Sequence, residues 1–145
     1  GIAWSTEGKT MYFTDSPRRT IWAMDYDTIN GSIGESRTFA TIENDSTQGT
    51  FDGATVDIED HYWCAEFGGG RLIRFAPDGS VNQLVDLPIS RPTCCAFGGK
   101  EMKTLFVTSA KIMMSREQMI KDPHAGDLIA IDVGVKGVPE TKFPA

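Results

Sequence analysis

Positive charge and long apolar runs are both scarce in this sequence. It has 14 Lys and Arg against 20 Asp and Glu, a formal net charge of −6, and a pI near 4.8. Neutralising the phosphates of a nucleic acid needs a basic surface, so this balance argues against a nucleic-acid partner. No apolar run approaches the roughly 18 residues of a membrane-spanning helix, so we expect no membrane partner either.

Cysteine and histidine are also few. The three cysteines are Cys64, Cys94 and Cys95. Their odd number, and the strain of a disulfide between neighbours, exclude a disulfide framework and favour a reducing, cytoplasmic location. There is no C-x-x-C pair, and His61 and His124 are far apart in the chain, which excludes a finger-type zinc site.

What the sequence does contain is a succession of short strand signals rich in Val, Ile, Thr and aromatic residues. Pairs such as Asn30-Gly31 and Asp78-Gly79 separate them and supply the positive φ angles of tight turns. The pattern predicts an all-β fold with strands at Gly1–Trp4, Thr10–Asp15, Thr20–Asp25, Arg37–Ile42, Ala54–Ile58, His61–Glu66, Arg71–Phe75, Val81–Asp86, Cys94–Phe97, Thr104–Ser109 and Leu128–Asp132.

One short helix is expected within the last group of strands. Ser115 precedes Arg116–Lys121 and Gln118 follows Ser115 by three residues, which is a capping-box spacing. Asp122-Pro123 should end this helix.

The strand signals repeat. Three segments share one plan, and if Trp4, Val56 and Phe97 are equivalent, the offsets are 52 and 41 residues. Such spacing suits the four-stranded blades of a β-propeller, and we favour this fold over a β-sandwich, which also consists of short strands.

About three four-stranded blades fit into residues 1–145, fewer than a closed propeller needs. We therefore expect a partial β-propeller domain that is the C-terminal half of a longer parent. The N-terminal half of the propeller, or another chain, should cover the open blade edges.

Several motifs carry a family resemblance. They are Gly1–Ser16, Trp22–Asp27, Asp52–Asp57, Gly68–Arg74, Pro77–Gly79, Arg91–Gly99, Leu105–Ala110 and Gly134–Gly137. In this order they resemble the regucalcin (senescence marker protein)/gluconolactonase family, over almost the whole chain.

The resemblance implies a six-bladed propeller with one divalent metal ion, calcium first and zinc second, at the top of the central channel. Members are often lactonases that open sugar lactones. The family's ligands are a Glu of the N-terminal half, an Asn that would immediately precede Gly1, and an Asp that maps onto Asp52.

Elementary chemistry agrees with a metal at Asp52. A hard cation held by oxygen ligands can polarise a lactone carbonyl, and a carboxylate beside it can deprotonate the attacking water. Asp52 is thus the expected metal ligand and catalytic base, although an Asp before Gly is also a common turn cap. Thr93 occupies the repeat-equivalent position and is either a substrate-binding residue or a plain strand-start Thr.

Other conspicuous residues favour structural roles. Cys94-Cys95 should be buried, Gly68–Arg71 should form a hairpin turn, and Glu66 and Asp15 should be exposed or cap turns. His61 should lie at a strand edge and His124 in a loop. Asn30-Gly31-Ser32 and Asn44-Asp45-Ser46 match the glycosylation pattern, which matters only in a secreted protein.

Three functions remain open at this point. The first is metal-dependent hydrolysis of a small sugar lactone by the full-length parent. The second is a calcium-binding regulatory protein without turnover, and the third is hydrolysis of another ester, such as a phosphotriester, on the same metal site.

Overall fold

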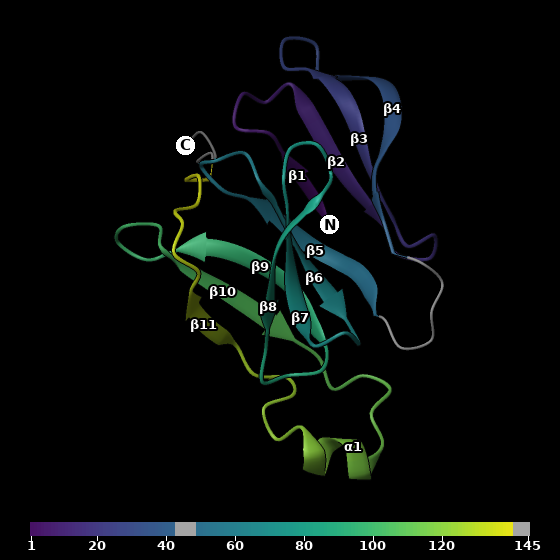
Figure 1. Cartoon of the computed structure of the whole chain (residues 1–145), viewed down its shortest axis with the longest axis vertical. Coiled ribbons are helices and arrows are strands. Elements are labelled where there is room, and N and C mark those ends of the chain that lie inside the picture. Colours follow the sequence, from purple (N-terminus) through teal and green to yellow (C-terminus); the bar gives the residue numbers. More distant parts are fainter. Residues whose placement is uncertain (43–48, 141–145) are drawn as a thin grey trace.

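A computed structural model describes residues 1–42 and 49–140, which form three antiparallel sheets (Figure 1). The first contains β1 (Ile2–Trp4), β2 (Thr10–Asp15), β3 (Thr20–Asp27) and β4 (Ser32–Thr41). The second contains β5 (Thr50–Val56), β6 (Tyr62–Phe67), β7 (Arg71–Phe75) and β8 (Val81–Asp86). The third contains β9 (Pro92–Gly98), β10 (Thr104–Ser109) and β11 (Ile129–Asp132), and α1 (Arg116–Lys121) lies between its last two strands.

These elements confirm the all-β fold and the strand pattern predicted from the sequence. β4, β5 and β9 begin earlier than expected, at Ser32, Thr50 and Pro92. The third sheet has three strands among the described residues, which are the last three strands expected from the sequence but one fewer than a complete four-stranded blade. The hairpin turn at Gly68–Arg71 is confirmed, since it joins β6 to β7.

The sheets meet through their first strands. β1 contacts β5, and β9 contacts both β5 and β6. Within each sheet the later strands follow outward in chain order. The three sheets therefore spread from a common line of inner strands, which is the arrangement of propeller blades.

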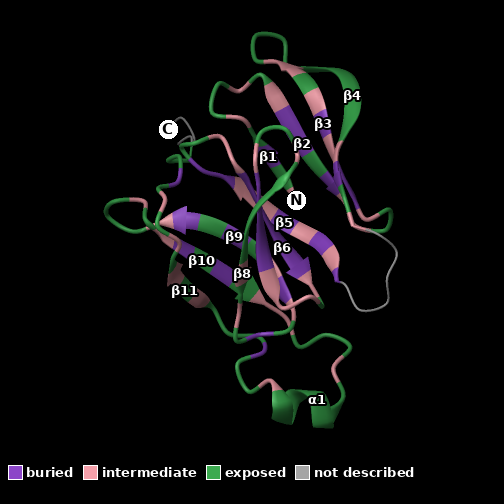
Figure 2. Cartoon of the chain, viewed as in Figure 1, coloured by how far each residue is buried: buried purple, intermediate pink, exposed green. Residues whose placement is uncertain are grey.

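Two hydrophobic cores lie between the sheets (Figure 2). The core between the first and second sheets includes Ala3, Tyr12, Ile21, Tyr62, Cys64, Ile73 and Phe75. The core between the second and third sheets includes Trp63, Ala65, Leu72, Cys95, Phe97, Leu105 and Val107. The middle sheet thus buries both of its faces, as alternation of side chains along a strand allows.

Helix α1 has the predicted capping box but contributes nothing to either core. The Ser115 hydroxyl accepts the Gln118 N–H at 3.2 Å, and the Gln118 side chain accepts the Ser115 N–H at 2.8 Å. No residue of the helix is buried. Within residues 1–42 and 49–140, no helix is long and apolar enough to span a membrane.

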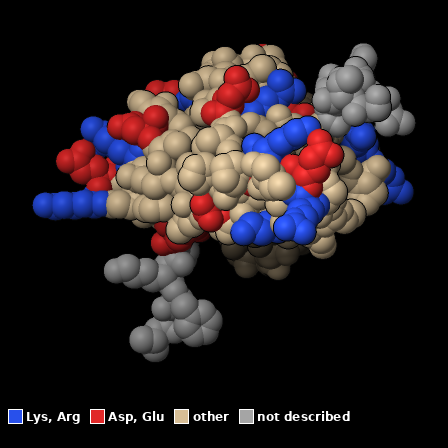
Figure 3. Space-filling model, turned by 90° about the horizontal axis from the view of Figure 1, so that it is seen from below, with Lys and Arg blue, Asp and Glu red and all other residues tan. Residues whose placement is uncertain are grey.

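Charge is spread over the surface that carries α1. Figure 3 views this end of the molecule and shows acidic and basic side chains interspersed, with neither sign gathered into one field. This face offers no broad basic surface.

A buried carboxylate joins three strands of the second sheet. Asp57 is fully buried and follows β5. It accepts the Trp63 indole N–H of β6 at 2.7 Å and the Arg74 Nε–H of β7 at 2.8 Å. Arg74 also donates to Glu59 at 2.6 Å. Burial lowers the pKa of Arg74, but hydrogen bonds to Glu59 and Asp57 outweigh burial, so its pKa is raised.

This network predicts a large effect of Asp57→Ala. The substitution leaves the Trp63 indole N–H and the Arg74 Nε–H without their acceptor. Breaking a buried charge pair costs about 3–5 kcal/mol, and the loss should lie at the lower end of this range because Arg74 keeps its bonds to Glu59 and Asn82. Urea unfolding should show this loss. The control is Asp25→Ala, which removes an exposed pair with Arg37 and should cost less than about 1 kcal/mol. Equal losses in the two variants would contradict a structural role for Asp57.

Candidate functional site

Asp52 lies where the first strands of the three sheets begin. It is the third residue of β5, and its neighbour Gly53 faces β9. A Cβ placed on Gly53 would lie 2.7 Å from the Cα of Cys94, so only glycine permits this approach of β5 to β9. On the other side, a Cβ on Gly1 would lie 2.7 Å from the carbonyl oxygen of Asp52. The repeat-based placement of Asp52 at the convergence of the inner strands agrees with this geometry.

The Asp52 carboxylate is half-buried and available to a cation. Burial raises its pKa above the usual 3.8, although a hydrogen bond from the Gly53 N–H acts in the opposite direction. Among the described residues, no ion pair involves Asp52. A desolvated carboxylate without a cationic partner fits a hard metal ion, since carboxylate oxygens are the ligands that Ca²⁺ prefers.

Thr93 lies at the same end of the inner strands, as the repeat predicts. It is the second residue of β9 and is partly exposed. Its hydroxyl lies 2.8 Å from the hydroxyl of Thr108 on β10. Thr93 therefore lies at the same end of the inner strands as Asp52 and keeps part of its surface exposed.

Two further acidic residues lie at this end, and of these Asp15 caps a turn, as expected, whereas the Glu66 side chain does not. Asp15 accepts both the backbone N–H and the guanidinium of Arg18. Glu66 accepts the Gly49 N–H at 2.9 Å and pairs with Arg71. The expectation of exposure is wrong for Glu66, because this pairing lets its carboxylate be fully buried. Glu66 thereby fixes the backbone that leads into β5 and Asp52.

The two adjacent cysteines have different surroundings. Cys95 is buried in the core between the second and third sheets, whereas Cys94 is exposed. The expectation of burial is therefore confirmed for Cys95 and wrong for Cys94, because consecutive residues of a strand point to opposite faces. All three cysteines are free thiols.

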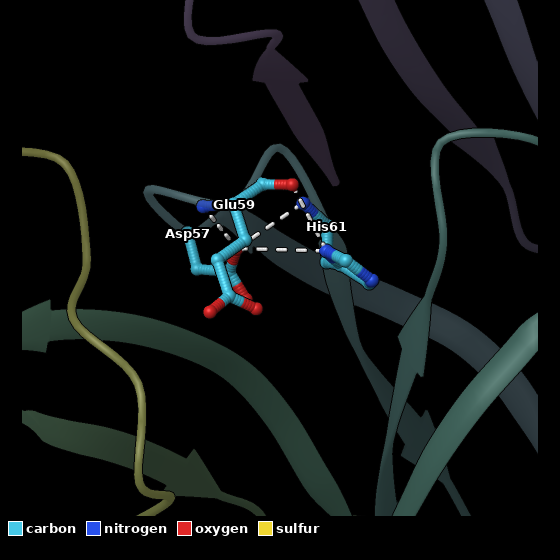
Figure 4. Close-up of side chains that lie close together, drawn as sticks. All are labelled: Asp57, Glu59 and His61. Carbon is cyan, nitrogen blue, oxygen red and sulfur yellow. Dashed lines mark hydrogen bonds and ion pairs between the residues drawn. The ribbon is translucent and has the colours of Figure 1, made fainter.

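Within residues 1–42 and 49–140, one cluster of possible metal ligands was not expected from the sequence; it consists of Asp57, Glu59 and His61 (Figure 4). One ligand atom from each lies within 4.8 Å of the others. However, the two Asp57 oxygens already accept four hydrogen bonds, from the Trp63 indole, Arg74 and the backbone N–H groups of Glu59 and His61. A metal ion would have to displace these donors, so the cluster stabilises the turn rather than presenting an open cation site.

His61 and His124 lie where the sequence predicts them, at a strand edge and in a loop. His61 directly precedes β6, and His124 lies in the loop after α1, 3.1 Å from Asp127. Asn30 lies in an exposed turn, where its side chain donates to Asp27. Asn44-Asp45-Ser46 falls outside the described residues.

A hollow of about 420 Å³ adjoins the opposite end of the same inner strands. Trp4 and Glu7 line it from the β1 side, Thr55 from β5, and Glu140 from the C-terminal segment. Asp52 does not line this hollow, so the candidate site and the hollow are separate.

Comparisons with known proteins agree with this arrangement. The SMP-30/Gluconolactonase/LRE-like region matches residues 1–111. The chain is 39% identical to regucalcin of Gallus gallus over 99% of its own length and 48% of the relative's, and 36% identical to regucalcin of Homo sapiens over 95% and 46%. It thus spans about half the length of the curated relatives that it matches.

Solved structures extend the likeness to the fold. A calcium-binding protein, regucalcin, from Agrobacterium tumefaciens superposes with a TM-score of 0.92 at 28% identity, over 100% of this chain and 49% of that one. A luciferin-regenerating enzyme superposes with a TM-score of 0.84 at 34% identity, over 95% and 46%. A gluconolactonase from Xanthomonas campestris gives 0.61 at 25% identity, over 74% and 33%. On sequence and architecture together, this chain belongs to the SMP-30/gluconolactonase family.

Proposed function

We propose that the full-length protein is a metal-dependent lactonase that opens small sugar lactones. The observation that carries this proposal is Asp52, a half-buried carboxylate without an ion pair at the convergence of the inner strands. The likeness to a gluconolactonase favours the reaction, and the likeness to a calcium-binding regucalcin favours calcium as the ion. A cytoplasmic location stays a prediction.

Asp52 has two roles in this proposal. Its carboxylate supplies one oxygen ligand, and it accepts a proton from the water that attacks the lactone carbonyl. When bound, a divalent cation supplies Lewis-acid polarisation of that carbonyl. In this proposal, Thr93 of the neighbouring strand β9 donates a hydrogen bond to the sugar.

The second candidate function is calcium binding without turnover. The regucalcin from A. tumefaciens is described as a calcium-binding protein, and a metal site alone needs no base. Hydrolysis of another ester on the same site is a third alternative. An assay of full-length protein, with and without chelator, distinguishes the three functions. Its substrates are a panel of aldonolactones and a phosphotriester. Calcium binding without turnover of any substrate would reject both hydrolase proposals.

Asp52→Asn tests the site. It removes one charged ligand with little change in shape, and loss of a direct ligand should lower calcium affinity at least about 100-fold, the upper range for outer-shell substitutions. Calorimetric titration of full-length protein measures this, and lactone opening should be lost in parallel. The matched control is Asp15→Asn, a carboxylate at the same end that caps a turn and should leave calcium affinity unchanged. Full calcium affinity in Asp52→Asn would reject the assignment.

The pH dependence follows from the raised pKa of Asp52. Protons compete with the metal for its carboxylate, so calcium affinity should fall as the pH falls through this pKa, above the usual 3.8. When a chelator keeps calcium off the protein, folding stability depends on pH in the opposite direction to calcium affinity. The ionised carboxylate is penalised by burial, so the folded state should lose stability as the pH rises through the same pKa.

Urea unfolding from pH 3 to 7, compared with Asp52→Asn, measures this difference. The variant lacks the titrating group, so its stability relative to the wild-type protein should increase over the window just above 3.8. Parallel pH profiles for the two proteins would show that Asp52 titrates normally.

A further inference from the structure

A fully buried carboxylate anchors the start of β5. It belongs to Glu66 of β6. Its Oε1 accepts the Gly49 N–H at 2.9 Å, and its Oε2 accepts the Nε–H of Arg71 on β7. Gly49 directly precedes β5, so a single side chain joins the start of this strand to the two strands that follow it in the sheet.

The surrounding backbone encloses this carboxylate. A Cβ on Gly69 would lie 2.6 Å from the Cγ and from the Oε1 of Glu66, and a Cβ on Gly49 would lie 2.9 Å from the same Cγ. Glycine at both positions therefore lets the β6–β7 turn and the start of β5 close around the side chain. Because Glu66 is buried inside this enclosure, water cannot replace its partners without opening the start of β5.

The anchored segment leads directly into Asp52. Phe51 pairs with Glu66, and the next regular pair joins Ala54 to Cys64. Two residues of β5, Asp52 and Gly53, thus lie opposite one residue of β6, which is a β-bulge. Bulges redirect a side chain and are common beside active sites. The direction of the Asp52 carboxylate therefore depends on how the chain enters the bulge.

We propose that Glu66 is a positioning residue of the metal site, which fixes the entry into β5 and thereby the direction of the Asp52 carboxylate. This inference rests on the proposed role of Asp52 as a metal ligand. Both contacts of Glu66 use an N–H donor of the protein, so both need an acceptor. A carboxylate has two accepting oxygens, whereas the amide of glutamine has one acceptor and one donor group. In Glu66→Gln, one of the two N–H groups would therefore face another donor.

Asp57 offers a matched comparison at the other end of β5. It is also fully buried, directly follows β5 and accepts hydrogen bonds from residues of β6 and β7. Three regular pairs, formed by residues 54–56 with β6, separate Asp57 from the bulge. The pair between Phe51 and Glu66 borders the bulge directly. We therefore expect a change at Glu66 to reach Asp52 and a change at Asp57 to be absorbed by the intervening pairs.

Calorimetric calcium titration of the full-length protein tests the proposal with Glu66→Gln and Asp57→Asn. Both variants should unfold at a lower urea concentration than the wild-type protein, because each leaves a buried donor unpaired. Glu66→Gln should also bind calcium about 10-fold more weakly, the lower end of the range for residues that orient a metal ligand. Asp57→Asn should keep the wild-type affinity. Wild-type affinity in Glu66→Gln, or an equal loss in Asp57→Asn, would overturn the proposal.

Gly69→Ala displaces the same carboxylate without changing any charge, and it serves as the second variant if Glu66→Gln does not fold. The added methyl group would lie 2.6 Å from the Oε1 of Glu66, so this oxygen must move away. Calcium affinity should fall by the same order as in Glu66→Gln. A folded Gly69→Ala protein with wild-type calcium affinity would contradict the role of Glu66.

Amide hydrogen exchange in the presence of chelator gives a readout that needs neither calcium nor turnover. Glu66→Gln should speed exchange in residues 49–53 more than in the rest of β5 and β6, because it releases the entry to the bulge locally. Asp57→Asn should not produce this local effect. Since the measurement is independent of lactone opening, a positive result supports positioning even if the protein only binds calcium. Unaltered exchange in residues 49–53 would reject positioning even if the lactonase assay succeeds.

Discussion

The packing of one sheet face on the next is the interaction on which the rest of this structure depends. Alternating side chains give each sheet two faces, and here both faces are apolar. Such a sheet cannot leave either face in water without losing the burial free energy of its large side chains, about 1.5–3 kcal/mol for each one. The second sheet buries both of its faces, with Tyr62 in one core and Trp63 in the other. A two-layer sandwich would bury only one face of each sheet, which is why these sheets fan out instead.

The same constraint produces the candidate site. Sheets that pack face to face around a common line bring their first strands close together, and Gly53 allows β5 to approach β9 without a side chain between them. The β5–β6 register shifts between Phe51 and Ala54, beside Asp52. Glu66 holds the entry to β5 through the Gly49 N–H. Asp52 is thus positioned by backbone geometry, and it has no ion pair within the part of the chain that the structure describes.

Much of this fold could be predicted from local pattern, because strand alternation, turn glycines and a capping box are local signals. The position of Asp52 and Thr93 at one end of the inner strands follows from the repeat for the same reason. The Asp57 network could not be predicted, since Asp57, Trp63 and Arg74 become neighbours only when β5, β6 and β7 pair. The burial of Glu66 was missed because a charge can be buried only with partners, here Gly49 and Arg71, that no local pattern links to it. The exposure of Cys94 beside buried Cys95 could have been predicted from alternation alone.

The segment around α1 lies outside both hydrophobic cores, so its sequence can vary without loss of the packing that stabilises the fold. The helix buries no residue and is held by its caps and a 2.7 Å pair between Glu117 and Lys121. Its surroundings are tied to the residues before β9, where Ser90 donates to Asp122 and Arg91 to the carbonyl of Ile112. These contacts place the segment at the end of the third sheet where Thr93 lies. Loops at this end can change without disturbing either sheet contact, because the cores lie between the sheet faces and not at their ends. A propeller can therefore keep its packing while the surface around its channel is altered to suit a different ligand.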